Sequence, residues 1–283
     1  MTSTQKRVAA IHDISGFGRC SLTVALPIIS AAGIECSVVP TAVLSTHTGG
    51  LEGFTYRDLT NDILPIAAHW QSLGLGFDAI YSGFLGSYKQ VEIVSDFIDR
   101  FRKADNLIVV DPVMADNGVL YKTFSLDFPK EMLKLCKKAD LIIPNMTEAA
   151  LLLGESYKKG PYTEIFIAKT LKKLASLGSK LVVLTGVQFD DKSLGAATYD
   201  STTGQINYAM AEIVPGFYHG TGDVFGSTLL AALLNGQSLA SSAQIAVNFV
   251  ASSIRRTYDA GTDPRFGINF EAGLASINYS SPK

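Results

Sequence analysis

Short apolar runs rich in β-branched residues recur through much of this chain, and most are separated by amphipathic stretches of helical length. Strands with so little polar alternation suit a parallel sheet that is buried on both faces, because crossover helices cover each side. The pattern therefore predicts an α/β fold with a doubly wound, mostly parallel central sheet flanked by helices. The runs are 7–11, 35–39, 79–82, 107–110, 141–143 and 181–184.

The pattern changes after residue 184. Apolar stretches at 195–199 and 206–213, separated by turn-forming residues, predict an antiparallel hairpin at one edge of the sheet. Helices at 223–234 and 238–258 are expected to complete the core. No internal repeat or interdomain linker is visible, so residues 1–283 are interpreted as a single domain.

Single residues predict several helix boundaries. Gly33, Gly74 and Gly178 each follow an apolar-periodic segment at the place where a glycine commonly ends a helix. Asn145 is expected to cap a helix that begins near Thr147, because its side chain can accept hydrogen bonds from the first free amides.

Composition excludes several classes of protein. The chain is 47% hydrophobic and 18% charged with a formal net charge of -2, which argues against disorder and against nucleic acid as a partner. The 3 cysteines form no CxxC pair, so neither a disulfide framework nor a zinc site is indicated, and a cytoplasmic location is expected. No segment approaches the roughly eighteen apolar residues of a membrane span.

The stretch 219–228 carries the most chemical information. Gly220 and Gly222 lead directly into a predicted helix, so the amides of residues 220–223 can point at one spot in front of the helix, where the dipole favours negative charge. A phosphoryl group suits that spot. Asp223, at the same helix start, could accept a proton from an attacking hydroxyl, which makes it the candidate general base.

Other interpretations of this stretch are open or excluded. The two glycines could form an ordinary tight turn, with Asp223 a first-turn acid that has no catalytic role. A dinucleotide-binding GxGxxG loop is excluded because Phe225 stands where the third glycine belongs, and the chain has no GxxxxGK[ST] phosphate loop.

The run Gly220-Thr221-Gly222-Asp223 resembles the signature of the ribokinase-like kinases, in which the Asp is the catalytic base and the preceding amides form an anion hole. Three other segments resemble elements of vitamin kinases in that superfamily: 111–116 (DPVMAD), 144–148 (PNMTE) and 184–186 (LTG), the last like a nucleotide-contacting turn after a strand. All follow predicted strands, so a doubly wound sheet would gather them at its carboxyl edge.

The resemblance implies MgATP as the phosphoryl donor. It makes Asp111 and Glu148 the metal carboxylates, while Asn145 would orient the same cluster. The alternatives are a capping box for Asn145 and Glu148 and a turn-starting role for Asp111. The residues implied on the ATP side are Asp116, Tyr121, Asn145, Thr185, Gly186 and Gly222.

The first third of the chain resembles the pyridoxal kinases in the segments 12–19, 44–48 and 81–86. The resemblance implies that Asp13, Ser15, His47, Thr48 and Phe84 bind the substrate. Members of that family usually have Ser in place of Asp13 and often Tyr in place of Phe84. An acidic residue at 13 could pair with a protonated pyridinium or an amine, and the alternative for His47 is a loop histidine with no ligand.

Two glycine-containing segments, 46–60 and 116–121, are interpreted as mobile loops that close over the substrates and exclude water. Tyr121 is either a contact of such a lid or a surface aromatic that packs on its own loop.

The function implied by the resemblance is ATP-dependent phosphorylation of the 5′-hydroxymethyl group of pyridoxal and related B6 vitamers. Hydroxymethylpyrimidine (phosphate) kinase of thiamine biosynthesis is the second interpretation, although those enzymes commonly have Cys in place of Asp223. A vitamin-phosphate carrier without catalysis is the third. Family members also suggest a homodimer and a monovalent cation, K⁺ or Na⁺.

Overall fold

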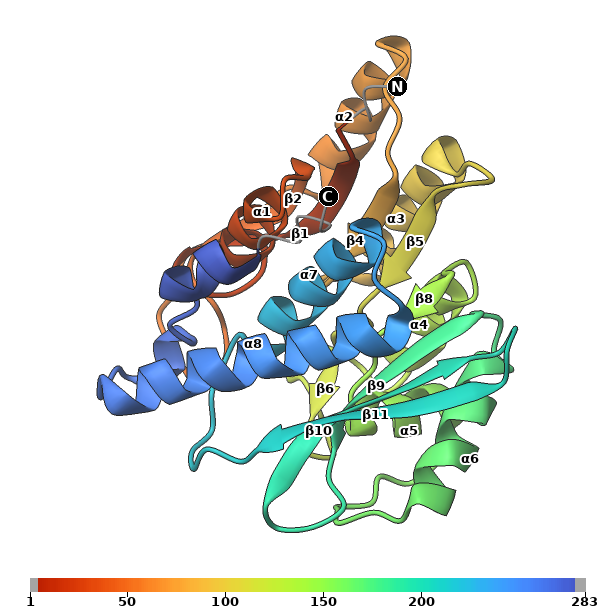
Figure 1. Cartoon of the computed structure of the whole chain (residues 1–283). Coiled ribbons are helices and arrows are strands. Elements are labelled where there is room, and N and C mark those ends of the chain that lie inside the picture. The colour runs from red at the N-terminus through yellow and green to blue at the C-terminus, as the bar shows by residue number, and fades with distance from the viewer. Residues whose placement is uncertain (1–4, 278–283) are drawn as a thin grey trace.

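A nine-stranded sheet forms the centre of the computed structural model, which describes residues 5–277 (Figure 1). Its strands run in the order β11-β10-β9-β8-β5-β4-β1-β2-β3. The strands of the parallel part are β1 (Arg7–Phe17), β2 (Glu35–Thr46), β4 (Ala79–Ser82), β5 (Leu107–Val110), β8 (Leu141–Ile142) and β9 (Leu181–Val187). The expected mostly parallel α/β sheet is thereby confirmed.

The central strands are short and apolar because both of their faces are covered. Every residue of β4 is buried, and β4 pairs in parallel with β1 on one side and β5 on the other. Such strands have no solvent face that would impose polar alternation. The sequence pattern was therefore strong here, and the predicted bounds of β4 and β5 match the structure.

Antiparallel strands lie at both edges of the sheet. The predicted hairpin is β10 (Ser193–Asp200) and β11 (Gln205–Glu212), which pairs with β9 through β10. At the opposite edge, β3 (Tyr56–Asp58) pairs with β2. The interpretation of 46–60 as a loop throughout was therefore wrong for residues 56–58. The sequence gives no signal for this strand, because all three of its residues are exposed and show no apolar alternation.

Helices cover both faces of the sheet, as Figure 1 shows for α7 and α8 on one face and α6 on the other. One apolar core lies beneath α2 (Thr60–Ser72), α3 (Tyr88–Phe101), α4 (Phe128–Cys136), α5 (Met146–Leu153) and α6 (Glu164–Ala175). A second core lies beneath α1 (Leu22–Ala31), α7 (Thr221–Leu234) and α8 (Leu239–Asp259). Two 3₁₀ segments follow, η1 (Pro264–Phe266) and η2 (Glu271–Ile277). None of the helices in the described part of the chain is long and apolar enough to cross a membrane.

The predicted helix boundaries have the expected local chemistry. Gly33, Gly74 and Gly178 have φ values of 79°, 68° and 135° just beyond α1, α2 and α6. Asn145 caps α5 by accepting hydrogen bonds from the amides of residues 147 and 148. These positions favour glycine or a capping amide because a regular helix cannot continue through them.

Candidate active site

The carboxyl ends of the parallel strands gather most of the predicted site residues. Asp13 lies in the last part of β1, His47 follows β2, Phe84 follows β4, Asp111 follows β5 and Glu148 lies in α5 just after β8. Neighbouring parallel strands end at the same edge of a sheet, and in open α/β folds that edge is where ligands bind. The candidate site is therefore this edge.

Asp13 lies at an irregularity where β1 and β2 shift register between His12 and Ile14. Its carboxylate accepts hydrogen bonds from Ser21 Oγ at 2.6 Å and Ser15 Oγ at 3.1 Å. Burial raises the pKa of Asp13, and the two hydroxyl groups together with His47 partly offset that rise. The backbone of Ser21 has φ 57°, in the left-handed region, which a residue with a side chain adopts only at a cost in strain.

The amino end of α7 meets the loop between β1 and α1. Gly220 precedes the helix with φ 73°, and a Cβ atom there would lie 2.0 Å from the carbonyl oxygen of Arg19. Glycine is thus required both by the backbone angle and by the approach of Arg19. The first amides of α7 have no partner inside the helix, so this helix start is consistent with the anion-binding position predicted from the GTGD run.

Asp223 lies in the first turn of α7. Burial raises its pKa to about 7, Asp13 adds to the rise, and the backbone of Ser21 opposes it. A carboxyl group with a pKa near neutrality exchanges a proton readily at physiological pH, which is what general-base catalysis requires.

Asp111 and Glu148 form a second acidic pair, on the side of the site nearer β5 and β8. Burial is the main cause that raises the pKa of Glu148 to about 8. Burial, then Glu148, then Asp223 hold the pKa of Asp111 well above its usual range. Among the ion pairs of residues 5–277, none involves these three carboxyl groups. Buried acids without a basic partner suit a hard cation.

Glu148 is also a structural residue. Its carboxylate accepts from the amide of Asn145 at 2.9 Å and from that of Met114 at 3.0 Å, which completes a capping box with Asn145. The Asn145 amide group donates to the carbonyl of Ala115 at 2.8 Å. The capping-box interpretation is thus confirmed, and it leaves Asp111 as the acid of the pair whose carboxylate accepts no hydrogen bond from the described residues.

A small hairpin lies next to α5 and its cap. It consists of β6 (Ala115–Asp116) and β7 (Val119–Leu120), joined by Asn117 and Gly118, which both have positive φ. Interpretation of 116–121 as a loop was therefore incomplete, since an Asn-Gly turn between short strands is a hairpin signal. The amide of Gly118 donates to Thr147 Oγ1 at 2.9 Å, which ties the hairpin to α5.

Tyr121 follows this hairpin and is 38% exposed. Burial of its hydroxyl group raises the pKa of Tyr121 well above the usual range, and Glu148, Asp116, Asp111 and Asp223 add to that rise in this order. The hydroxyl group is thus within electrostatic reach of all four acids. Whether Tyr121 is a contact of a lid or packs on its own loop stays a prediction.

Thr185 and Gly186 lie inside β9, so their prediction as a turn after the strand was wrong. The strand continues to Val187, which pairs with Gly195 across a register shift in β10. Gly186 has φ 74° at this irregularity. Thr185 still lies beside the site, because it forms an isolated bridge with Asn145 and its amide donates to the carbonyl of Pro144 at 3.0 Å.

His47 uses both ring nitrogens inside the protein. Nδ1 accepts from the amide of Gly49 at 3.1 Å, and Nε2 lies 2.5 Å from the carbonyl oxygen of Arg265. This pattern assigns the proton to Nε2 and favours the loop-histidine interpretation. Thr48 is exposed, and the half-buried ring of Phe84 lies 5.7 Å from that of Phe124.

Three features near the site were not predicted. Ser21 orients Asp13, the His219 ring lies 5.0 Å from the His47 ring, and the turn 263–267 contacts both histidines' loops. Only the third had a visible signal, the turn-forming Asp263-Pro264 pair. The contacts themselves join segments far apart in the chain, which local patterns do not reveal.

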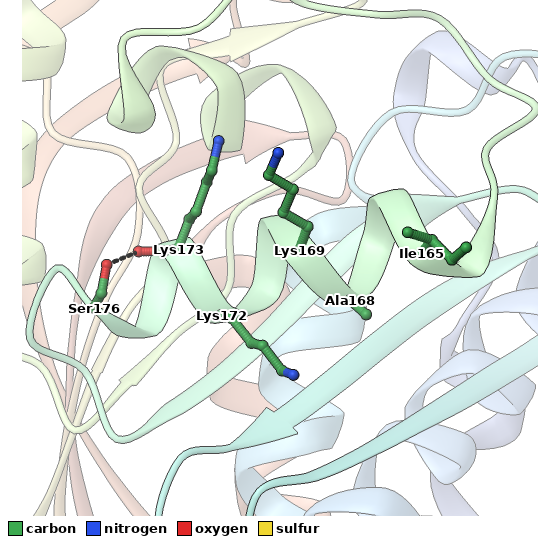
Figure 2. A pocket seen from close by; sticks show the side chains of 6 residues that line it. All are labelled: Ile165, Ala168, Lys169, Lys172, Lys173 and Ser176. Carbon is green, nitrogen blue, oxygen red and sulfur yellow. Dashed lines mark hydrogen bonds between the residues drawn. The ribbon is translucent and has the colours of Figure 1, made fainter.

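A hollow away from this edge of the sheet lies on α6. A shallow depression of about 580 Å³ on α6 is lined by Ile165, Ala168, Lys169, Lys172, Lys173 and Ser176 (Figure 2). Its lysines are solvent-exposed side chains on one helix, and Lys173 is paired with Glu155. It contains none of the predicted site residues and is not the candidate site.

Solved structures resemble this chain over nearly its full length. A candidate phosphomethylpyrimidine kinase from Bacteroides thetaiotaomicron, crystallised with pyridoxal, is 41% identical with a TM-score of 0.92, and the match covers 97% of this chain and 96% of that one. Pyridoxal kinase from Lactobacillus plantarum is 32% identical with a TM-score of 0.88, and the match covers 97% of each chain.

Curated relatives carry both kinds of kinase name. The chain is 29% identical to the pyridoxine/pyridoxal/pyridoxamine kinase of Bordetella avium, over 88% of this chain and 85% of that protein. It is 28% identical to the chloroplastic thiamine biosynthetic bifunctional enzyme TH1 of Arabidopsis thaliana, over 92% of this chain but only 49% of that protein. The family model described as phosphomethylpyrimidine kinase matches residues 26–266. This protein therefore belongs to the phosphomethylpyrimidine kinase family, within the ribokinase-like superfamily that also contains the pyridoxal kinases it resembles.

Proposed function

We propose that this kinase uses ATP to phosphorylate the 5′-hydroxymethyl group of pyridoxal and related B6 vitamers. The observation that carries the proposal is the position of Asp223, whose pKa is raised to about 7 and whose carboxyl group lies within electrostatic reach of Asp13. A candidate base and a candidate ring-binding acid thus share one site. The Bacteroides relative crystallised with pyridoxal supports this choice of ring.

In the proposed reaction Asp223 accepts the proton of the hydroxymethyl group as its oxygen attacks the γ-phosphorus of ATP. The new oxygen–phosphorus bond forms while the bond to the β–γ bridging oxygen breaks, which yields the 5′-phosphate and ADP. The amides of Gly220, Thr221 and Gly222 face the charge that develops on the transferred group. Donors preorganised in this way contribute about 3 kcal/mol each in comparable enzymes.

Magnesium fits the acidic pair. No group of three or more metal-ligating side chains was found in the described part of the chain, but Mg²⁺ commonly takes only one or two carboxylates and fills its shell with water and phosphate oxygens. Asp111 would hold the ion, and Glu148 would support it through its charge because backbone amides already occupy its oxygens. The bound ion offsets the negative charge of the polyphosphate.

The triphosphate would lie between the hairpin and the end of β9. We assign to this side the residues predicted from the resemblance. Five of them lie in or beside the hairpin, the cap of α5 and β9, where Asn145 bridges to Thr185, and the sixth, Gly222, lies in the first turn of α7. They are Asp116, Tyr121, Asn145, Thr185, Gly186 and Gly222.

The vitamin would lie on the other side of Asp223, near the β1–α1 loop. Asp13 is the candidate partner of the ring nitrogen or of an amine, with Ser15 orienting its carboxylate. Phe84 would contact the ring. His47 and Thr48 are assigned to the loop that borders the vitamin, since both ring nitrogens of His47 are already engaged.

The proposal is tested by measuring ADP formation with MgATP and, in parallel, pyridoxal, pyridoxamine, pyridoxine and hydroxymethylpyrimidine. We expect turnover of the B6 vitamers and its loss in Asp223→Asn, a variant of nearly the same shape. Turnover of the pyrimidine alone would contradict the proposed substrate. Turnover of no substrate would favour a carrier.

Hydroxymethylpyrimidine (phosphate) kinase is the second candidate function. It is favoured by the match of residues 26–266 to the phosphomethylpyrimidine kinase family. Asp223 argues against this function, because those enzymes commonly have Cys at that position. The parallel assay above separates the two substrates directly.

Other features of the proposed enzyme stay predictions. We propose that residues 1–283 form one catalytic domain, which is supported by a sheet that joins β1 to β11. A homodimer, a cytoplasmic location and a requirement for K⁺ or Na⁺ each need their own measurement.

A further inference from the structure

Three consecutive carbonyl groups in the turn 263–267 each accept a hydrogen bond from a different loop of the candidate site. The carbonyl of Pro264 accepts from the amide of His219 at 3.3 Å, and that of Phe266 accepts from the amide of Arg19 at 2.9 Å. Between them, the carbonyl of Arg265 accepts from His47 Nε2 at 2.5 Å. One short turn thus connects the segment 219–222 at the start of α7, called the phosphate loop below, with the β1–α1 loop and the loop after β2.

Side chains strengthen the contact between the turn and the β1–α1 loop. The ring of Phe266 packs edge to face with that of Phe17 at 5.1 Å between centroids. Arg19 Nε donates to Glu271 at 2.5 Å, just beyond the turn. Gly267 leaves room for this approach, because a Cβ atom there would lie 2.6 Å from Arg19 Cβ and 2.7 Å from its carbonyl oxygen. The turn and the β1–α1 loop are therefore in direct backbone contact.

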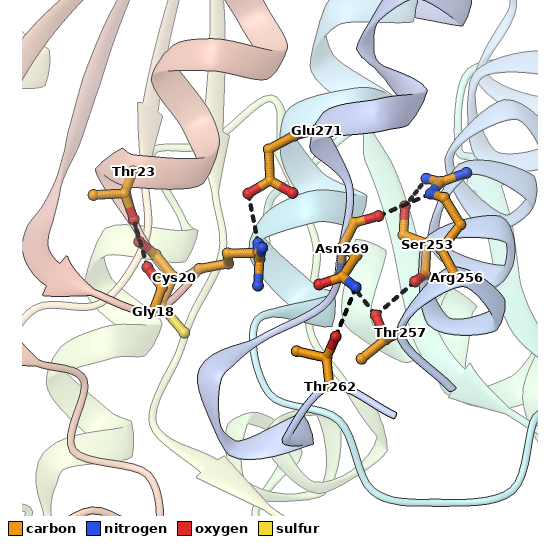
Figure 3. Close-up of polar contacts among 10 residues, drawn as sticks. Gly18, Cys20, Thr23, Ser253, Arg256, Thr257, Thr262, Asn269 and Glu271 are labelled. Atoms are coloured by element: carbon orange, nitrogen blue, oxygen red, sulfur yellow. Dashed lines mark hydrogen bonds and ion pairs between the residues drawn. The ribbon is translucent and has the colours of Figure 1, made fainter. Parts of the chain in front are cut away.

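Hydrogen bonds join Asn269, which lies two residues beyond the turn, to α8 (Figure 3). The amide of Asn269 donates to Thr257 Oγ1 at 2.7 Å, and the Asn269 carbonyl accepts from Arg256 Nε at 2.9 Å. Asn269 Nδ2 also donates to Thr262 Oγ1 at 2.9 Å. At the start of the turn, Asp263 accepts from the amide of Arg265 at 3.0 Å. That bond lies within the turn, but just before it the amide of Thr262 donates to the carbonyl of Thr257 at 3.1 Å, so the residues on both sides of the turn are bonded to α8.

We propose that the turn 263–267 is a positioning element, which fixes the vitamin-binding loops relative to the phosphate loop and so sets the distance between the attacking hydroxyl and the γ-phosphorus. This inference rests on the proposed function. A fixed turn can do this because all three loops bond to adjacent carbonyls, so none can shift without breaking a hydrogen bond. Misplacement of reacting groups by about 1 Å can lower a rate about 100-fold.

Gly267→Ala tests the proposal, with Gly261→Ala as its control. Both glycines have positive φ, but nothing lies within 4 Å of a Cβ atom at Gly261. We expect Gly267→Ala to lower kcat/KM for pyridoxal about 10-fold or more. KM for pyridoxal should rise more than KM for ATP, because two of the three loops that the turn holds are assigned to the vitamin. Hydrogen exchange at the amides of Arg19 and His219 should accelerate, while Gly261→Ala changes neither readout.

A second pair of variants guards against simple loss of folding. Asp263→Ala removes the oxygen that caps the turn, whereas Asp263→Asn retains an acceptor for the amide of Arg265. The Ala variant should show the same change in KM and exchange, and the Asn variant should restore both. An active wild-type enzyme whose kinetics are unchanged in Gly267→Ala and Asp263→Ala would overturn the inference. An inactive wild-type enzyme would instead contradict the proposed function.

Discussion

Asp223 lies in the first turn of α7 and has a raised pKa. The reaction rate should therefore depend on whether its carboxyl group is protonated. As a base it must be deprotonated, and its pKa is about 7. We expect kcat/KM for pyridoxal to fall as the pH drops below about 7 and Asp223→Asn to lose about 10²- to 10⁴-fold in kcat. A pH series with saturating MgATP checks both. A wild-type rate in Asp223→Asn would rule out the assigned role.

The same pKa has a consequence for stability. Because the folded-state pKa of Asp223 lies above its ordinary value of 3.8, the folded protein binds more protons than the unfolded chain between pH 4 and 7. Its contribution to the free energy of unfolding therefore falls as the pH rises through this window. Asp223→Asn should raise Tm at pH 8 and change it little at pH 4, in scans without divalent cations. A lower Tm at pH 8 would contradict this expectation.

At this scale the sequence predicted the types of residues well and their partners poorly. Asp223 was singled out because a glycine pair and an apolar helix adjoin it in the chain. The bonds from Ser21 to Asp13 and from His47 to Arg265 were missed, because they depend on loops that meet only in the folded protein.

The start of α7 illustrates how elements constrain individual glycines. At Gly220 a Cβ atom would meet the carbonyl of Arg19 at 2.0 Å, whereas nothing lies within 4 Å of one at Gly222. We expect Gly220→Ala to lower the free energy of unfolding by at least about 1 kcal/mol from its left-handed backbone alone. Gly222→Ala should be neutral or stabilising by up to about 1 kcal/mol, since it replaces a helical glycine. Urea unfolding of both variants measures the difference, and equal losses would contradict it.

The hairpin of β6 and β7 makes a similar prediction for the nucleotide side. A Cβ atom at Gly118 would lie 2.7 Å from the ring of Tyr157, and the glycine has φ 81°. Gly118→Ala should displace the hairpin and raise KM for ATP several-fold, with a smaller effect on KM for pyridoxal. Gly154→Ala is the control, because it also has positive φ but no neighbour within 4 Å. An unchanged KM for ATP would show that the hairpin does not contact the nucleotide.

Elements buried on both faces were the most predictable. The bounds of β4 and β5 follow from their apolar runs, but β1 and β2 continue well beyond theirs. The extra residues include polar and small side chains that become strand only because β1 and β2 pair with each other. The edge strand β3 likewise has no apolar signal, because it becomes a strand only by pairing with β2.

At the scale of the whole molecule, the site combines acids from separate parts of the sheet. Besides burial, the negative charges of Glu148 and Asp223 raise the pKa of Asp111, and no ion pair among residues 5–277 involves these carboxyl groups. Mg²⁺ should therefore raise Tm at pH 8, and by less in Asp111→Asn. Turnover should cease in EDTA and return with Mg²⁺. A shift in Tm that is the same in both proteins would argue against Asp111 as the ligand.

The fold class of the whole molecule was predicted because alternating strands and helices leave few other arrangements. The choice between a pyridine and a pyrimidine substrate could not be predicted in this way. Both rings suit the same sheet edge, and only the contacts of a few side chains, such as Asp13, would distinguish them.

The bond from Arg19 to Glu271 joins residues 252 positions apart, and that from His47 to Arg265 joins residues 218 apart. At about 5–20 residues per second, a ribosome needs roughly 10 to 50 s to make the chain between such partners. The β1–α1 loop and the loop after β2 are thus synthesised early, and their final contacts form only after nearly all of the described chain has emerged. Catalytic competence should consequently be among the last properties that a newly made molecule acquires.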